Sequence, residues 1–276
     1  MWRKGCGFVR ANDFEVKMLG LRLFMHAVRM TANNWQAALQ IFALPIAVTL
    51  LILMGLTTLV GLGPFFLFTG ETAEFSGSGP ATTFLFILCL LCIWLTMSIG
   101  VVHWHRFILL GEMPRSLMFR LSWMQALKYM IGALAIFLVL ILPLILVTLV
   151  ASKIAGGFMK QGDLWVAQGL DLVINLGFLT ALLALSPILP AAAIDRKFKL
   201  GDAVVAMSGS LKALIVCAIC LGCVELLAET VINLLVFVSW QLAALSSVVF
   251  SAFTGLIGIS LITTLYGHYI EDRPLS

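Results

Sequence analysis

The chain has 276 residues, of which 62% are hydrophobic and 11% are charged, and its mean hydropathy is +1.10. Soluble domains are roughly 45–50% apolar and about 25% charged, so this composition excludes an ordinary soluble fold and makes lipid the solvent for most of the surface. The formal net charge is +4, but the basic residues are scattered at the ends of apolar runs. This distribution favours contact with a membrane surface and argues against nucleic acid as a partner.

The first 40 residues predict an amphipathic helix. Polar residues recur at spacings of 7, 4, 3 and 4, which places them on one face of a helix. They are Glu15, Arg22, His26, Arg29 and Asn33. Charged side chains interrupt the apolar core that a signal peptide would need. The helix can lie in the membrane interface with this stripe toward the headgroups, or it can pack beneath the bundle of spans; the sequence leaves both open.

Six later runs are long and apolar enough to cross a bilayer, which takes about 20 such residues. They are Ile41–Gly63, Thr83–Trp104, Tyr129–Ala151, Leu170–Ile194, Leu211–Val238 and Leu242–Tyr269. We therefore expect an all-α, polytopic integral membrane bundle, with residues 1–276 forming a single membrane domain. Pro143, Pro187 and Pro190 should kink the third and fourth spans.

The basic residues predict the orientation of the bundle. Of the 17 Lys and Arg residues, all but Lys153 and Lys160 fall on the side of the N-terminal segment. Because Lys and Arg are enriched in cytoplasmic loops, both termini should be cytoplasmic. We expect a multi-pass protein of a bacterial inner membrane.

Two octapeptides that close even-numbered spans are similar to each other, HRFILLGE at 105–112 and DRKFKLGD at 195–202. The matched pairs are Arg106 with Arg196, Leu110 with Leu200, Gly111 with Gly201, and Glu112 with Asp202. In each, the Arg is expected to anchor the span at the headgroups, the Gly to end a helix in the left-handed conformation, and the acid to favour the start of a new helix. Together with similar segments at 28–39, 119–127 and 205–214, they predict three repeats, each an amphipathic cytoplasmic helix followed by a two-span hairpin.

Polar residues inside two spans form a candidate site. Glu225, Glu229 and Asn233 are each four apart in the fifth span, and Asp171 and Asn175 are four apart in the fourth. Carboxylates at such depth cost several kcal/mol unless paired, wetted or protonated. They could form a pocket for a proton, a cation or an amine on the far side of the membrane, or hydrogen-bond between helices as structural glue.

Other polar and small residues indicate contacts rather than chemistry. His103 and His105 flank Trp104 at a span end, where interfacial anchoring explains them better than metal binding. The candidate headgroup contacts are His105, Arg106, Arg196, Lys197, Arg22 and Arg29. A ridge of small residues on the last span could pack within the monomer, against a second copy or against a partner in a membrane complex. This ridge comprises Ala243, Ser247, Ser251 and Gly255.

Enzyme signatures do not occur in the sequence: there is no HExxH, GxSxG, phosphate loop or Rossmann glycine pattern. Five of the six cysteines lie inside apolar runs, where Cys behaves as a small hydrophobe. We therefore expect no catalytic residues, no metal and no cofactor, although an intramembrane enzyme is not excluded.

At HRFILLGE and PAAAIDRKFKLGD the chain resembles a group of six-span bacterial inner-membrane proteins. These are similar in layout to the membrane domain attached to some glycerophosphodiester phosphodiesterases. The phosphodiesterase activity is not implied, because the soluble catalytic domain has no counterpart here; the resemblance implies an inner-membrane location and a connection with lipid. Three hypotheses follow, in this order: handling or sensing of lipid or a small amphiphile, a small transporter using the acidic cluster, and a structural subunit of a membrane complex.

Overall fold

All of the regular structure is α-helical in the residues that the computed structural model describes, which are 13–59, 79–113, 123–159 and 164–275. The helices are α1 (Asp13–Asn33), α2 (Trp35–Leu59), α4 (Pro80–Leu110), α5 (Trp123–Met159), α6 (Leu164–Leu185), α7 (Ile188–Ala193), α8 (Leu200–Met207), α9 (Leu211–Val236) and α10 (Trp240–Ile270). Six stretches in them are long and apolar enough to cross a membrane: Trp35–Thr58, Thr83–Leu110, Trp123–Ile154, Gln168–Ala193, Leu211–Val236 and Trp240–Ile270. The prediction of a six-span helical membrane protein is confirmed.

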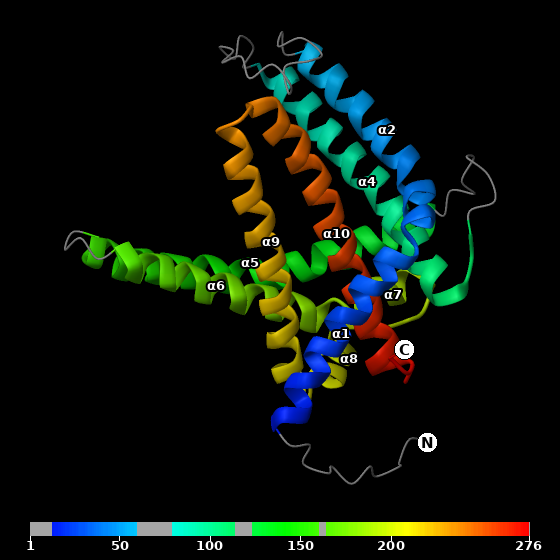
Figure 1. Cartoon of the computed structure of the whole chain (residues 1–276). Helices are drawn as coiled ribbons and strands as arrows, with labels where there is room; N and C mark the ends of the chain where they lie inside the picture. Colours follow the sequence, from blue (N-terminus) through cyan, green and yellow to red (C-terminus); the bar gives the residue numbers. More distant parts are fainter. Residues whose placement is uncertain (1–12, 60–78, 114–122, 160–163, 276) are drawn as a thin grey trace.

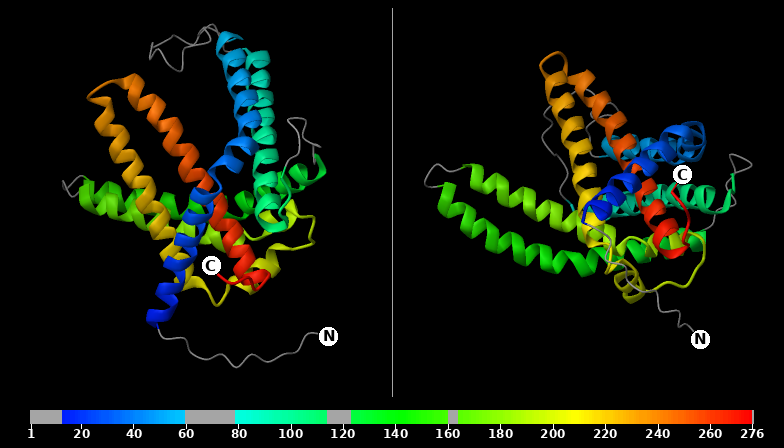
Figure 2. Two further views of the ribbon diagram at one scale, coloured as in Figure 1. Left: turned by 45° about the vertical axis from the view of Figure 1, so that its right-hand side comes forward. Right: turned by 60° about the horizontal axis from the view of Figure 1, so that its bottom comes forward.

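The spans pair into three antiparallel hairpins, α2 with α4, α5 with α6, and α9 with α10. The hairpins share one base and diverge from it, and the α5–α6 hairpin projects away from the other two (Figures 1 and 2). Helices α1, α7 and α8 lie at this base. The arrangement leaves most side chains of the hairpins exposed or only half-buried, as expected for helices whose solvent is lipid.

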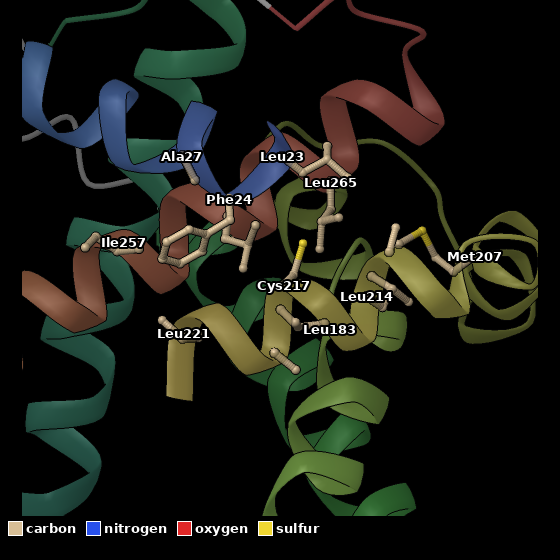
Figure 3. Packing of buried hydrophobic residues seen from close by; sticks show 13 residues of the cluster. Leu23, Phe24, Ala27, Leu183, Met207, Leu214, Cys217, Leu221, Ile257 and Leu265 are labelled. Atoms are coloured by element: carbon tan, nitrogen blue, oxygen red, sulfur yellow. The ribbon is translucent and has the colours of Figure 1, made fainter. Parts of the chain in front are cut away.

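The largest buried cluster lies at the base and is organised around α1 (Figure 3). Leu23, Phe24 and Ala27 of α1 pack against α9 and α10, with further residues from α6 and α8. The backbones approach closely at Gly20, where a Cβ atom would lie 2.6 Å from the carbonyl oxygen of Ala213. Of the two interpretations that the sequence left open, α1 therefore adopts the second: it packs against the span bundle.

The prediction that a glycine ends a helix in the left-handed conformation is confirmed in the first octapeptide and wrong in the second. Gly111 has φ 70° and donates its N–H to Phe107 O, which caps α4. Gly201, by contrast, lies in the first turn of α8. Asp195 is the left-handed residue there, with φ 65°. The N–H groups of Asp195 and Arg196 bond to the carbonyls of Ala192 and Ala191, which is the Schellman pattern at the end of α7.

The two octapeptides consequently occupy different positions relative to their helices. Arg106 lies within α4, whereas Arg196 follows the end of α7. The acid does start a helix in the second copy, since the Lys199 N–H donates to Asp202 Oδ2 over 2.9 Å. In the first copy Glu112 pairs with Arg106 instead. The three-hairpin layout agrees with a repeat, but the register that matches Arg106 to Arg196 is not reproduced in the backbone.

Proline interrupts the fourth span as expected. α6 ends at Leu185, and Pro187 caps the start of α7 after a turn at Ser186. A proline here removes a backbone donor and crowds the preceding turn. α5, in contrast, continues as one helix through Pro143.

Candidate functional site

The polar residues predicted to form an intramembrane site are not brought together. Glu225, Glu229 and Asn233 on α9 are exposed, as are Asp171 and Asn175 on α6. α6 packs against α9 near the base, through Leu183 and Leu214 among others. From this crossing the two helices diverge toward their polar ends (Figure 1).

No hydrogen bond or ion pair joins these polar side chains in the described part of the chain. Asn175 donates to the backbone oxygen of Asp171 on its own helix, over 3.0 Å. The expectation of one pocket shared by the fourth and fifth spans is therefore not met within the monomer, because the five side chains are exposed beside a contact that reaches Leu176 of α6 and Val224 of α9.

The residues at the end of the second span are buried instead of interfacial. Trp104 and His105 both have 0% exposure, because α2 and α10 cover Trp104 and the Tyr129 ring of α5 lies beside His105. The prediction that His105 contacts headgroups is thus wrong, as is the interfacial placement of Trp104. Two hydrogen bonds to α10 replace those contacts: Trp104 Nε1 donates to Ser260 Oγ over 3.1 Å, and His105 Nδ1 lies 2.8 Å from Thr263 Oγ1.

A polar seam therefore joins α1, α4 and α10. Thr31 Oγ1 of α1 donates to Ser260 Oγ over 2.9 Å, so this hydroxyl serves both α1 and α4. Thr263 Oγ1 donates to Ile259 O and hence accepts from His105 Nδ1–H. Polar bonds of this kind stabilise helix association in lipid.

On one side of this seam lies a polar cavity of about 230 Å³ between α1, α4, α10 and the C-terminal tail. Its basic lining comes from His26, His268 and Arg273, and hydroxyls come from Thr263 and Thr264. The remaining lining residues are Met30, Ile108, Leu109, Gly267, Pro274 and Leu275. The tail is held over α10 because the Arg273 N–H donates to Gly267 O and its Nη2 donates to Leu109 O.

On the other side lies an apolar groove of about 380 Å³ between the α2–α4 hairpin and α10. Its lining is Thr31, Ala32, Trp35, Ala38, Leu39, Phe42, Ile46, Met97, Ser251, Ala252, Phe253, Gly255, Leu256 and Ile259. Trp35 is 56% exposed and Leu39 is 60% exposed, so the groove opens sideways from the molecule. Two members of the small-residue ridge, Ser251 and Gly255, form part of it.

The small-residue ridge is thus divided between two environments. Ala243 is buried within the monomer, and Ser247 is half-buried. Gly255 is exposed, and a Cβ atom there would meet nothing within 4 Å. The ridge is consequently not one continuous packing face.

The predicted cationic headgroup contacts differ in how accessible they are. Arg22, Arg29 and Lys197 are exposed. Arg106 is half-buried, where it bonds to Glu112 and to the Ala193 carbonyl oxygen, and Arg196 pairs with Glu271 over 3.0 Å. Three members of this set are therefore both exposed and without an ion pair among the described residues: Arg22, Arg29 and Lys197.

An ion pair also joins the second hairpin to the base. Lys128 of α5 pairs with Asp195, and Gln125 donates to the same carboxylate over 3.5 Å. The hydrogen bond from Lys128 is the main cause that lowers the pKa of Asp195, against a smaller opposing effect of burial. Asp195 thus has two local functions, the left-handed end of α7 and the link to α5.

The seam and the polar cavity were not predicted from the sequence, although a signal for them exists. Ser260, Thr263, Thr264 and Gly267 recur at spacings of three and four in the last span. This is the same pattern of small and polar residues that indicates helix contacts in membranes. Extending the ridge beyond Gly255 would have included them.

Among the described residues, no group of three or more His, Cys, Asp or Glu side chains is placed to hold a metal ion. Comparison of the chain with models of protein families, with curated proteins and with solved structures finds no match. The function is therefore argued from the cavity, the groove and the placement of charge.

Proposed function

We propose that the chain is a non-enzymatic, multi-pass protein of a bacterial inner membrane that binds a membrane lipid or a similar amphiphile. The apolar groove between α2 and α10 carries this proposal, since it is an open, apolar channel bordered by spans. An apolar chain that leaves the bilayer for such a groove keeps a hydrocarbon environment, and the packing of the chain against side chains supplies the attraction.

The dimensions of the groove suit one leaflet of a bilayer. Between Trp35 and Ile46, α2 extends about 16 Å, taking a rise of about 1.5 Å per residue. The hydrocarbon core of a bilayer is about 30 Å thick, so the groove covers about half of it. Trp35 at one end is a residue type that favours the membrane interface. A lipid chain entering there would extend toward the midplane.

The orientation with cytoplasmic termini is part of the proposal. The described basic residues of α1, of the end of α4 and of the segment from α7 to α9 lie at the base, whereas Lys153 lies in the last turns of α5, away from the base. This asymmetry supports a cytoplasmic base by the positive-inside rule. The bacterial inner membrane itself is proposed from the resemblance at HRFILLGE and DRKFKLGD.

Filling the groove tests the proposal. A Leu side chain at Gly255 meets no neighbour at its Cβ, so Gly255→Leu should fold and occupy part of the groove. Displacing about ten atom–atom contacts of the lipid chain, at about 0.1–0.2 kcal/mol each, should weaken lipid binding about tenfold. Gly177→Leu is the matched control, because Gly177 on α6 is also exposed and open.

The measurement is native mass spectrometry of each variant purified in mild detergent. We expect bound lipid on the wild type and on Gly177→Leu. The affinity of Gly255→Leu for the same lipid should be about tenfold lower. Equal lipid retention by all three proteins would contradict the proposal. A protein retained by the wild type and lost from Gly255→Leu would favour the alternative role as a subunit of a membrane complex.

A further inference from the structure

We infer that the polar cavity binds the phosphate-bearing, anionic headgroup of the lipid whose chain lies in the apolar groove. This inference rests on the proposed function and adds the ligand class. It starts from the positions of the two spaces: Thr263 lines the cavity and Ile259 lines the groove, one turn apart on α10. On α1, Met30 lines the cavity and the adjacent Thr31 lines the groove.

The separation fits one amphiphile. One turn of α10 is about 5.4 Å, comparable with the step from the first carbons of a lipid chain to its phosphate. The seam of Thr31, Ser260 and Trp104 lies between the two spaces and holds α1, α4 and α10 together. Because the seam residues are buried, a lipid would lie over the outer side of the seam, with its chain on the Trp35 side and its headgroup on the Arg273 side.

The residues lining the cavity select the sign of the headgroup, and Arg273 is the charged one among them. Arg273, His26 and His268 line it, and no carboxylate does so among the described residues. Glu271, the acid that pairs with Arg273, also pairs with Arg196 and so is shared between two cations. Arg22 and Arg29, on the same stripe of α1 as His26, are exposed and add to the positive field.

Arg273 has the donors that phosphate recognition needs. Its Nη2 bonds to Leu109 O over 2.8 Å and to Glu271 over 2.7 Å, which fixes the guanidinium beside the cavity. Its Nε and Nη1 hydrogens have no hydrogen-bond partner among the described residues. Each of these two groups can donate a single charge-assisted hydrogen bond to a phosphate oxygen. A zwitterionic lipid would carry its choline or ethanolamine cation into the same positive surroundings.

The test compares two lipids with identical chains, dioleoyl phosphatidylglycerol and dioleoyl phosphatidylcholine, added to delipidated full-length protein in detergent. Native mass spectrometry measures the ratio of the two bound species. We expect the wild type to prefer the anionic lipid by about tenfold, because both lipids carry the phosphate but only phosphatidylcholine brings a cation close to Arg273. Arg273→Gln should weaken the binding of both lipids, which share the phosphate, and bring their ratio close to one. Lys153→Gln removes a cation on α5, away from the cavity, and should keep the wild-type ratio.

Further variants separate the inference from the proposed function and from unfolding. His26→Gln should reduce the preference if Arg273→Gln proves too unstable to purify. An unchanged ratio in the purifiable cavity variants, with Gly255→Leu still releasing both lipids, would overturn the headgroup inference and leave the proposed function standing. Failure of the wild type to bind either lipid would overturn both the headgroup inference and the proposed function.

Inorganic phosphate competing with the anionic lipid in the wild type supports the cavity as the phosphate site. Phosphate binding that is lost in Arg273→Gln, without any lipid preference in the wild type, would make it a free-anion site and overturn the lipid inference.

Discussion

Asp195 occupies the left-handed region of backbone conformation, which costs an ordinary L-residue about 1–2 kcal/mol but is tolerated by Asn, Asp and Gly. Its carboxylate also accepts from Lys128 on the neighbouring hairpin. At the residue scale, one side chain thus ends α7 and ties α5 to the base. The sequence placed the helix-ending residue at Gly201 because glycine is the usual residue for that position. A short polar side chain that bonds locally can replace it.

Substitutions at Asp195 separate these two contributions. Asp195→Asn removes the charge and keeps the backbone tolerance, so we expect a change below about 0.5 kcal/mol for this exposed pair. Asp195→Ala should cost about 1 kcal/mol more, because Ala is strained at φ 65°. Asp195→Gly should avoid that strain. Thermal unfolding of the three variants in one detergent measures the order; Ala no worse than Asn would contradict it.

The pH dependence of this pair has a defined sign. Because the pKa of Asp195 is lowered in the folded protein, its stabilising effect is present above the unfolded value of about pH 4 and is lost as pH falls through the folded pKa. The stability difference between the wild type and Asp195→Asn should therefore shrink below about pH 4, and a difference that grows on acidification would contradict this assignment.

At the scale of elements, the sequence predicted that α1 is an amphipathic helix but did not predict what it packs against. The spacing of Arg22, His26 and Arg29 correctly gave an amphipathic helix, since periodicity is a local property. Its partner was not predictable from that pattern, because an apolar face fits either lipid or protein. The close approach at Gly20, and the bond from Cys217 Sγ to Gly20 O over 3.2 Å, depend on residues almost 200 positions away.

Gly20 provides a direct test of this packing. In Gly20→Ala the new Cβ would lie 2.6 Å from a backbone oxygen and 2.7 Å from Val216 Cβ, so α1 must move away from α9. We expect a loss of about 1–3 kcal/mol in unfolding free energy, as for other overpacked sites. Gly177→Ala, in an open position on α6, should be neutral or stabilising by up to about 1 kcal/mol. If both variants unfold alike, α1 does not pack as described.

At the scale of the whole molecule, composition sufficed to predict six helical spans, because each span is an apolar run recognisable by itself. It did not predict how the hairpins diverge. The spans are apolar around most of their circumference, so few residues indicate which face meets a neighbour. For the same reason Trp104 and His105 were assigned to the interface: nothing local shows that α10 covers them. The sequence identified the five polar residues of the candidate acidic site, but it did not show that they fall into two separate sets.

Substitution of the two glutamates on α9 tests whether the hairpins diverge. Glu225 and Glu229 are exposed and have no hydrogen-bond or ion-pair partner among the described residues. Neutralising both in the double variant E225Q/E229Q should leave the thermal stability unchanged or raise it, because an unpaired carboxylate in hydrocarbon is costly. A fall of several degrees in the melting temperature would show that the carboxylates have a partner in the purified protein, such as a second copy of the chain.

The bond between Thr31 and Ser260 joins residues 229 positions apart. α1 leaves the ribosome early, but its binding surface on α9 and α10 is made last. At a synthesis rate of about 5–20 residues per second, the wait is on the order of tens of seconds. During that time α1 lacks the partner surface that buries Leu23, Phe24 and Ala27 in the finished protein. The order of synthesis thus makes the docking of α1 a late step, which cannot be completed before the last hairpin is in place.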